Sequence, residues 1–314
     1  MHTRIRDLSH VLLVTAAMAT GPLGTALHSA TTALPPNVHV AGSTLFVTAD
    51  VNRWDNIRVT MSNGDFVVNR TGNAAYLRPG ARCAPRANGT LLCQGEHVTS
   101  VRIDTGDFTD SIVAAVTVPV TAKGGTGRDT INMSGQRAPH NTLYGGGGND
   151  TVIGSAHADT LLGDEQDDTL DGLGGADVFA GGTGRDHVTY ASRGGPVIVT
   201  SDRRPNDGGL GERDNVGSDV EDVTGGRGAD RLFGNSLDNR LAGNGGDDVL
   251  VGDRGRDDLV AGAGSDTLLG GAGRDRLYAD DNDSRLDVLF GDADRDLCVI
   301  TPADMRMTCE VFTR

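Results

Sequence analysis

Acidic side chains recur every nine residues through much of this 314-residue chain. Each stands sixth in a unit that reads Gly-Gly-x-Gly-x-Asp-x-U-x, where U is aliphatic. The fullest copies are GGTGRDTIN at 124–132, GGGGNDTVI at 145–153, GGTGRDHVT at 181–189, GGRGADRLF at 225–233 and GGAGRDRLY at 270–278. The glycines permit positive φ and let backbone carbonyls crowd inward, and the x-U-x triplet is long enough for a short strand. The unit is therefore a bend rich in oxygen ligands, followed by a strand.

The sixth positions form two unbroken series. The first comprises Asn141, Asp150, Asp159, Asp168, Asp177 and Asp186, and the second comprises Glu221, Asp230, Asn239, Asp248, Asp257, Asp266 and Asp275. Asp129 precedes the first series by twelve residues, and Asp287 and Asp296 follow the second by twelve and twenty-one. Repeats therefore cover most of residues 124–297.

This ligand mixture favours a hard cation. Ca²⁺ takes six to eight oxygen ligands, mainly carboxylate and carbonyl oxygens, and one bend with a single Asp supplies too few. Two bends must therefore share an ion. The competing interpretation is a metal-free solenoid in which each Asp caps its own turn. The net charge of −15 argues against it, because stacked bends place carboxylates roughly 4.8 Å apart.

These arrays resemble the parallel β-roll of secreted RTX (hemolysin-type) calcium-binding repeat proteins of the actinobacterial type. The resemblance extends from about Asp104 to the C-terminus. It implies that two nonapeptides complete one coil, so that stacked partners lie eighteen residues apart with calcium between the bends. The pairs best equipped for this are Asp150 with Asp168, Asp168 with Asp186, Asp159 with Asp177, Asp230 with Asp248, Asp248 with Asp266, and Asp257 with Asp275.

The resemblance implies a set of calcium ligands at the sixth positions. They are Asp129, Asp150, Asp159, Asp168, Asp177, Asp186, Asp230, Asp248, Asp257, Asp266, Asp275 and Asp296, with Asn141, Glu221 and Asn239 as weaker candidates. Three bends depart from the pattern and are poor candidates: GSAHAD at 154–159, GNSLDN at 234–239 and ADDNDS at 279–284.

The expected fold is all-β, a parallel β-roll or β-solenoid with an N-terminal all-β cap region. Short β-runs separated by Asn, Asp and Gly turns fill residues 38–120, and a separate sandwich is the alternative there. The predicted segments are a signal peptide (1–33), the N-terminal region (38–120), the first array (121–189), an inserted strand and loop outside the coil (190–220), the second array (221–297) and a C-terminal cap (298–314).

The first residues are typical of a secretory signal peptide. Arg4 and Arg6 precede a short apolar run at 11–19 and small residues near Ala26, with cleavage expected near 26–33. No apolar stretch approaches the length of a membrane span. The sequence therefore predicts a secreted protein.

Four cysteines fit an exported protein. Cys83 and Cys93 flank a polar loop, and Cys298 and Cys309 flank the last turn, so each pair could form a local disulfide at one end of the coil. A zinc site is the alternative, but no Cys-x-x-Cys or His pair accompanies the cysteines.

No catalytic motif is found, so an enzyme is not expected. The acidic composition argues against nucleic acid, whose phosphates require clustered lysine and arginine. Calcium is the predicted partner of a structural or binding module outside the cell, and an extracellular macromolecule is a further partner to be tested for. A carbohydrate-active enzyme and a cell-surface adhesin are the alternative functions.

Overall fold

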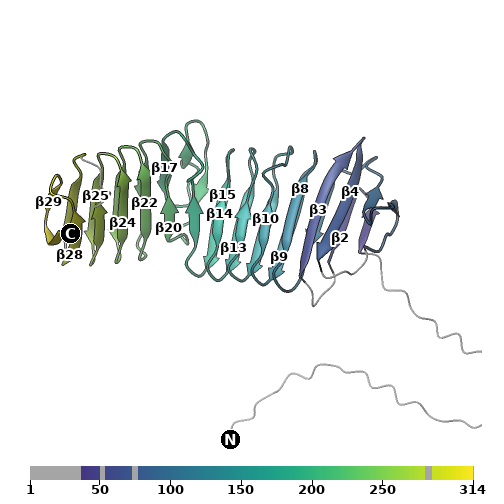
Figure 1. The fold of residues 1–314 in the computed structure, drawn as a ribbon, viewed down its shortest axis with the longest axis horizontal. Helices are drawn as coiled ribbons and strands as arrows, with labels where there is room; N and C mark the ends of the chain where they lie inside the picture. The colour runs from purple at the N-terminus through teal and green to yellow at the C-terminus, as the bar shows by residue number, and fades with distance from the viewer. Residues whose placement is uncertain (1–36, 50–53, 73–76, 280–284, 314) are drawn as a thin grey trace, which may run out of the picture. The chain divides into compact units, whose positions relative to one another are not determined.

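The computed structural model describes residues 37–49, 54–72, 77–279 and 285–313 (Figure 1). The predicted signal peptide at 1–33 and most of the bend at 279–284 lie outside the described residues. The described residues form strands and turns without any helix, and their strands stack as a parallel β-solenoid, which confirms the expected fold class. This part of the chain accordingly holds no helix long and apolar enough to cross a bilayer.

The strands belong to three sheets. The first sheet has the order β1 (Val38–Ala41), β2 (Thr44–Thr48), β7 (Ser100–Asp104), β9 (Val120–Thr126), β11 (Thr142–Gly147), β13 (Thr160–Glu165), β15 (Val178–Thr183) and β19 (Asn215–Val216). The third sheet has the order β18 (Gly208–Gly209), β17 (Val197–Thr200), β21 (Arg231–Phe233), β23 (Val249–Arg254), β25 (Thr267–Ala272), β27 (Val288–Ala293) and β29 (Met305–Met307).

The second sheet runs the length of both arrays. Its order is β5 (Cys83–Pro85), β6 (Leu91–Cys93), β4 (Asp65–Gly72), β3 (Asp55–Ser62), β8 (Ser111–Ala115), β10 (Thr130–Asn132), β12 (Thr151–Ile153), β14 (Thr169–Asp171), β16 (His187–Thr189), β20 (Asp222–Thr224), β22 (Arg240–Gly245), β24 (Asp258–Ala263), β26 (Arg276–Ala279), β28 (Asp296–Ile300) and β30 (Cys309–Thr313).

Two nonapeptides complete each regular coil. Leu143 of β11 pairs with Leu161 of β13, and Val152 of β12 pairs with Leu170 of β14, each eighteen residues further on. All four side chains are fully buried, as the aliphatic position of the repeat predicts. Each short strand contributes little more than one such side chain, so the core is a thin column of stacked aliphatic residues.

The N-terminal region continues the same coil. β7 pairs in parallel with both β2 and β9, and β8 pairs in parallel with both β3 and β10. Antiparallel pairs, β1 with β2 and β3 with β4, then β4 with β6 and β6 with β5, close this end. The region is therefore a solenoid finished by hairpins and not a separate sandwich.

The segment 190–220 does not lie outside the coil, contrary to the expectation from sequence. β17 pairs in parallel with β21 and antiparallel with β18, and these two strands begin the third sheet, while β19 pairs with β15 and ends the first sheet. Between β16 and β20 the chain thus adds two strands to the third sheet and one to the first. The periodicity is lost here because β17 and β19 are separated by the polar segment 201–214, which contains the short β18.

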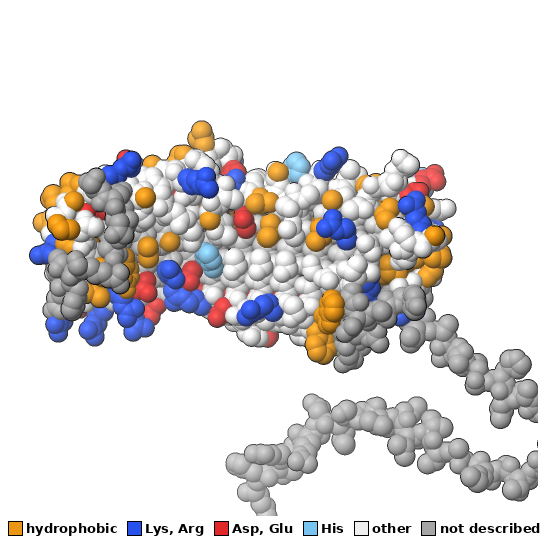
Figure 2. All heavy atoms as spheres, viewed as in Figure 1, with side chains coloured by type: hydrophobic (Ala, Val, Ile, Leu, Met, Phe, Trp, Pro, Cys, Tyr) orange, Lys and Arg blue, Asp and Glu red, His pale blue; other side chains and the backbone are white. Residues whose placement is uncertain are grey.

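The outward faces of the two arrays differ in charge. Across the second sheet, Asp222, Arg240, Asp258 and Arg276 alternate in sign on neighbouring strands, and Arg276 approaches Asp258 at 3.3 Å. The corresponding positions of the first array are Thr130, Thr151 and Thr169. Figure 2 shows the result, a largely uncharged surface over the first array and clustered arginine and acidic side chains over the second.

Both predicted cysteine pairs are disulfides. Cys83 is bonded to Cys93, which joins β5 to β6, and Cys298 is bonded to Cys309, which joins β28 to β30. No free cysteine remains, so the zinc alternative is wrong. The two bonds therefore staple the first hairpins and the last coil.

Removing the C-terminal staple with Cys298→Ser and Cys309→Ser together should cost about 2–3 kcal/mol of unfolding free energy, because the bond closes a loop of 11 residues. Hydrogen exchange should show β28 and β30 losing protection before the central strands. Non-reducing peptide mapping of the wild-type protein is the control. A link between an N-terminal and a C-terminal cysteine would contradict the assignment.

Candidate calcium sites

Carboxylates at the sixth position form ladders along the solenoid. In each step the backbone N–H of one Asp donates to Oδ1 of the Asp one coil later. The ladder beside the second sheet contains seven such steps at 2.5–3.0 Å: Asp55 to Asp110, Asp110 to Asp129, Asp129 to Asp150, Asp150 to Asp168, Asp168 to Asp186, Asp257 to Asp275, and Asp275 to Asp296. The sixth position therefore both bends the chain and joins neighbouring coils.

Shorter ladders lie beside the other two sheets. Next to the first sheet, Asn141 donates to Asp159, Asp159 to Asp177, and Asp177 to Asp214. Next to the third sheet, the donor and acceptor pairs are Asp230 with Asp248, Asp248 with Asp266, Asp266 with Asp287, and Asp287 with Asp304. All six stacked pairs named from the sequence are therefore adjacent, and each is joined by such a bond.

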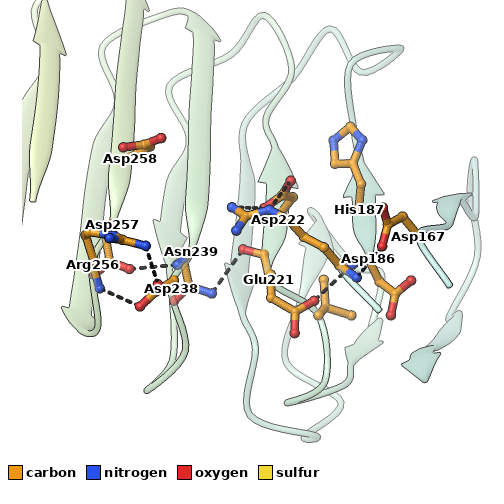
Figure 3. Close-up of polar contacts among 12 residues, drawn as sticks. Asp167, Asp186, His187, Glu221, Asp222, Asp238, Asn239, Arg256, Asp257 and Asp258 are labelled. Atoms are coloured by element: carbon orange, nitrogen blue, oxygen red, sulfur yellow. Dashed lines mark hydrogen bonds and ion pairs between the residues drawn. The ribbon is translucent and has the colours of Figure 1, made fainter. Parts of the chain in front are cut away.

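The ladder continues between the arrays through two substituted positions (Figure 3). Asp186 donates its N–H to Oε2 of Glu221 at 2.9 Å, and Asn239 donates to Oδ1 of Asp257 at 2.7 Å. Between them, the side-chain amide of Asn239 donates to the carbonyl of Glu221. Asn141 holds a ladder place in the same way, accepting from the N–H of Val120. The weaker candidates thus preserve the stacking with an amide or a longer carboxylate.

The second carboxylate oxygen distinguishes two kinds of bend. In most, Oδ2 is buried and has no hydrogen-bond partner; these are the bends of Asp110, Asp129, Asp150, Asp168, Asp177, Asp186, Asp248, Asp257, Asp275 and Asp296. A buried carboxylate oxygen without a donor is costly, so it requires a proton or a cation. We call these the open bends.

In the other kind, the sixth residue caps its own bend. Oδ2 of Asp159 accepts from the N–H and the hydroxyl of Ser155, and Oδ2 of Asp230 accepts from the N–H of Gly226 at 2.6 Å. Oδ1 of Asn239 likewise accepts from the N–H of residue 235. The metal-free interpretation thus describes these three bends, and a calcium-binding role for Asp159 and Asp230 stays a prediction in competition with the cap.

The open bends have the oxygen-rich shape that Ca²⁺ requires. A Cβ placed on Gly145 would stand 2.6 Å from Oδ2 of Asp150 and 2.8 Å from the carbonyl oxygen of Gly163. The corresponding distances from Gly270 are 2.6 Å to Asp275 and 2.9 Å to the carbonyl of residue 291. Only glycine leaves this space, into which a carboxylate and a carbonyl of the next coil both project. Such hard neutral and anionic oxygens are calcium ligands.

Carbonyl oxygens must supply much of the coordination. Within the described residues, no group of three or more Asp, Glu, His or Cys side chains converges as a metal cluster. Each ion would therefore take its carboxylates from the ladder and its remaining ligands from the bends or water. This agrees with positive φ at the second and fourth glycines, such as Gly146 and Gly148, because that conformation turns successive carbonyls.

Burial strongly favours the protonated form of the ladder carboxylates in the absence of a cation. It raises the pKa of Asp129, Asp168 and Asp257 to about 7 and the pKa of Asp248 and Asp275 to about 6. The charges of neighbouring carboxylates in the same ladder also contribute to these raised pKa values. Burial and the adjacent Asp214 raise the pKa of Asp177 to about 9. A divalent cation would relieve the same cost without a proton.

Several ladder residues were missing from the predicted ligands. Asp110 and Asp287 both belong to the ladders, but neither is among the calcium ligands predicted from the sequence. Asp214 was missed entirely, although Asp-x-Val at 214–216 is the same carboxylate and aliphatic spacing. Its Oδ1 accepts from Asp177, and its Oδ2 accepts from the hydroxyl of Tyr190 at 3.0 Å. The distance of thirty-seven residues from Asp177 hid it from a nine-residue count.

A comparison with protein-family models finds a known repeat in both arrays. A family model described as the RTX calcium-binding nonapeptide repeat, comprising 4 copies, matches residues 140–170, 153–188, 224–259, 251–286 and 260–298. These ranges contain open bends of all three ladders. No curated protein matches the chain at a significant level.

The pair Asp248 and Asp247 tests whether the open bends bind calcium. Asp248 is buried in a ladder, whereas its neighbour Asp247 is exposed and contacts Arg285. Asp248→Asn keeps an acceptor for the N–H of Asp230 but removes the charge, so it should raise the calcium midpoint for folding. Each lost site removes about 1.4 kcal/mol of stabilisation at tenfold calcium excess.

The matched control is Asp247→Asn, which changes the net charge by the same amount at the adjacent residue. It should leave the calcium midpoint nearly unchanged. Circular dichroism at increasing calcium measures both variants. Equal shifts in the two midpoints would contradict the assignment of the buried position as a ligand.

The raised pKa values predict that the calcium-free protein is more stable in mild acid. The folded state holds protons on these carboxylates up to pH about 6–7, whereas an unfolded Asp loses its proton near the ordinary value of 3.8. The stabilisation that these carboxylates contribute to the folded state is therefore fully present below about pH 4 and is lost as the pH rises through 6–7. Circular dichroism in chelator should therefore show more β-structure at pH 5 than at pH 8.

Calcium should abolish or reverse this difference, because protons and the cation compete for the same oxygens. The control is therefore the same pair of spectra in excess calcium. A chelated protein with more β-structure at pH 8 than at pH 5 would show that the ladder carboxylates do not dominate the pH dependence.

Proposed function

Residues 140–188 and 224–298 are RTX calcium-binding nonapeptide repeats, and from this premise we propose that the protein is a secreted module whose β-roll is assembled by calcium outside the cell. Its role is structural or binding, and we assign it no catalysis. The observation that carries the proposal is the series of open bends. In those of Asp129, Asp150, Asp168, Asp248, Asp257 and Asp275, a buried, partnerless Oδ2 lies beside a carbonyl in a space that only glycine leaves.

The energetic balance supports dependence on calcium. Each regular coil buries few aliphatic side chains, while its many glycines lose much conformational freedom on folding. Ionised neighbours in a ladder repel one another, by roughly 3 kcal/mol at an effective dielectric constant of 20 and the strand spacing. A cation between bends converts this repulsion into attraction.

An extracellular setting supplies the oxidising conditions and the calcium that this fold requires. Disulfides such as Cys83–Cys93 persist in oxidising environments. Calcium sites of extracellular modules bind with dissociation constants of about 10⁻⁴–10⁻³ M, so they fill only where calcium is abundant. The basic and apolar N-terminal sequence is the export signal in this proposal.

Calcium titration of the exported protein tests the proposal. Circular dichroism should show a largely disordered chain in chelator and a cooperative gain of β-structure near 10⁻⁴–10⁻³ M calcium. Several linked sites, each contributing about 1.4 kcal/mol at tenfold excess, make the transition steep.

Magnesium is the control ion. It prefers strict octahedral geometry and retains its waters, so it should substitute poorly at the same concentrations. A complete β-spectrum in excess chelator would overturn the proposal, because it would show that the repeats fold without metal.

A further inference from the structure

Two exposed aromatic side chains flank a groove at the N-terminal end of the second sheet, far in sequence from the matched repeats. Trp54 precedes β3 and is 44% exposed, and Phe108 precedes β8 and is 53% exposed. The groove between them encloses about 490 Å³ and is also lined by Asn56, Thr109, Asp110, Ser111 and Thr130. Figure 2 shows the corresponding hydrophobic patch at the lower edge of this face, beside an uncharged surface.

The conformation of Phe108 is unusual. It stands at the fourth position of its bend, where the following coils have Gly127, Gly148, Gln166 and Gly184. Its φ of 75° lies in the left-handed region, which is unfavourable for a bulky side chain. Its carbonyl lies directly below Gly127, so it occupies the regular glycine place in the stack. Gln166 has a φ of 73° at the same position, so the bend imposes this conformation. What is particular to this coil is the bulky aromatic ring that the bend holds outward.

The polar lining forms a flat, hydrogen-bonding floor. Asn56, Ser111 and Thr130 are register partners on the adjacent strands β3, β8 and β10, so their side chains follow one another across the sheet. None of the exposed lining residues is charged. The one ionisable member, Asp110, is 3% exposed, and its Oδ1 accepts from the N–H of Asp55. The groove therefore combines two aromatic faces with neutral hydroxyl and amide groups.

We propose that this groove binds a neutral polysaccharide chain. The C–H faces of sugar rings are apolar and pack on aromatic rings, while their hydroxyls exchange hydrogen bonds with amides and hydroxyls of the floor. Neutral ligands fit because the lining offers neither the cations that a nucleic acid or acidic glycan needs nor exposed anions.

The adjoining surface indicates an extended ligand and not a single sugar. A second hollow of about 270 Å³ shares Asn56 and Ser111 with the groove and continues over β4 to Asn69 and Thr71. One exposed cation, Arg58, also lines this second hollow, whereas the groove itself has none. The two hollows together extend across neighbouring strands of the sheet, so several sugar rings can be accommodated. This site shares only the buried Asp110 with the carboxylate ladder and needs calcium only for the folded scaffold.

The test uses the only tryptophan of the chain as its own probe. In calcium-saturated protein, cellohexaose or laminarihexaose should shift the emission of Trp54, and polygalacturonate should not. Calorimetry with the neutral hexaose should show affinity lowered about tenfold or more by Trp54→Ala and by Phe108→Gly. Phe108→Gly restores the residue that the backbone conformation favours, so it removes the ring without straining the fold.

Leu210→Ala is the matched control, because Leu210 is a fully exposed apolar side chain on the loop at 201–214. It should leave affinity unchanged, and circular dichroism in calcium should show all three variants folded. The proposal is overturned if neither neutral hexaose binds the folded protein at millimolar concentration, or if both aromatic variants bind as wild type. Preference for polygalacturonate would also overturn it. Emission that depends on protein concentration, with a dimer in sedimentation, would show instead that a second copy covers the groove.

Discussion

The whole solenoid depends on one interaction, the hydrogen bond from the backbone N–H of each ladder Asp to the carboxylate of the next. A bond to a charged acceptor contributes about 1.5–3 kcal/mol, roughly twice a neutral one, and here it recurs once per coil along each ladder. The same bond fixes the orientation of the carboxylate. With Oδ1 committed to the neighbouring coil, Oδ2 is directed under the glycines of its own bend. Stacking and metal affinity therefore come from the two oxygens of a single side chain.

The periodic part of this arrangement could be predicted from sequence. A nine-residue count identified the stacked pairs, such as Asp150 with Asp168, because coil length, aliphatic core and ladder all share that period. The same count marked the bends at 154–159 and 234–239 as irregular, and both are self-capped. Periodicity succeeds wherever each coil contacts only its identical neighbours.

The rest of the fold and of the candidate site could not be predicted from the sequence, because it depends on contacts that interrupt the nine-residue period. Asp230 has a complete repeat motif, yet it caps its own bend where the neighbouring segment is irregular, since Arg193 lies against Gly226 in place of a glycine bend. Asp214 joins the ladder beside the first sheet only because the loop at 201–214 returns to the coil. The buried Tyr190 and the ion pair between Arg193 and Glu212 support this loop. The sequence did not predict the aromatic groove for the same reason, because Trp54 and Phe108 come to line one groove only when β3 and β8 pair.

The coil that follows the insertion, together with the first bend of the next coil, differs from the open bends in its hydrogen bonding. A side-chain oxygen of Glu221, Asp230 and Asn239 each accepts a hydrogen bond within the protein, and none of these residues leaves a buried oxygen without a partner. In a linear array, order nucleates in one coil and spreads to its neighbours. This coil can order before any cation arrives, and it contacts both arrays through the second sheet. Calcium would then control how many coils fold onto this nucleus in each direction. The two arrays can therefore fold separately at the same ion concentration, each from the same nucleus.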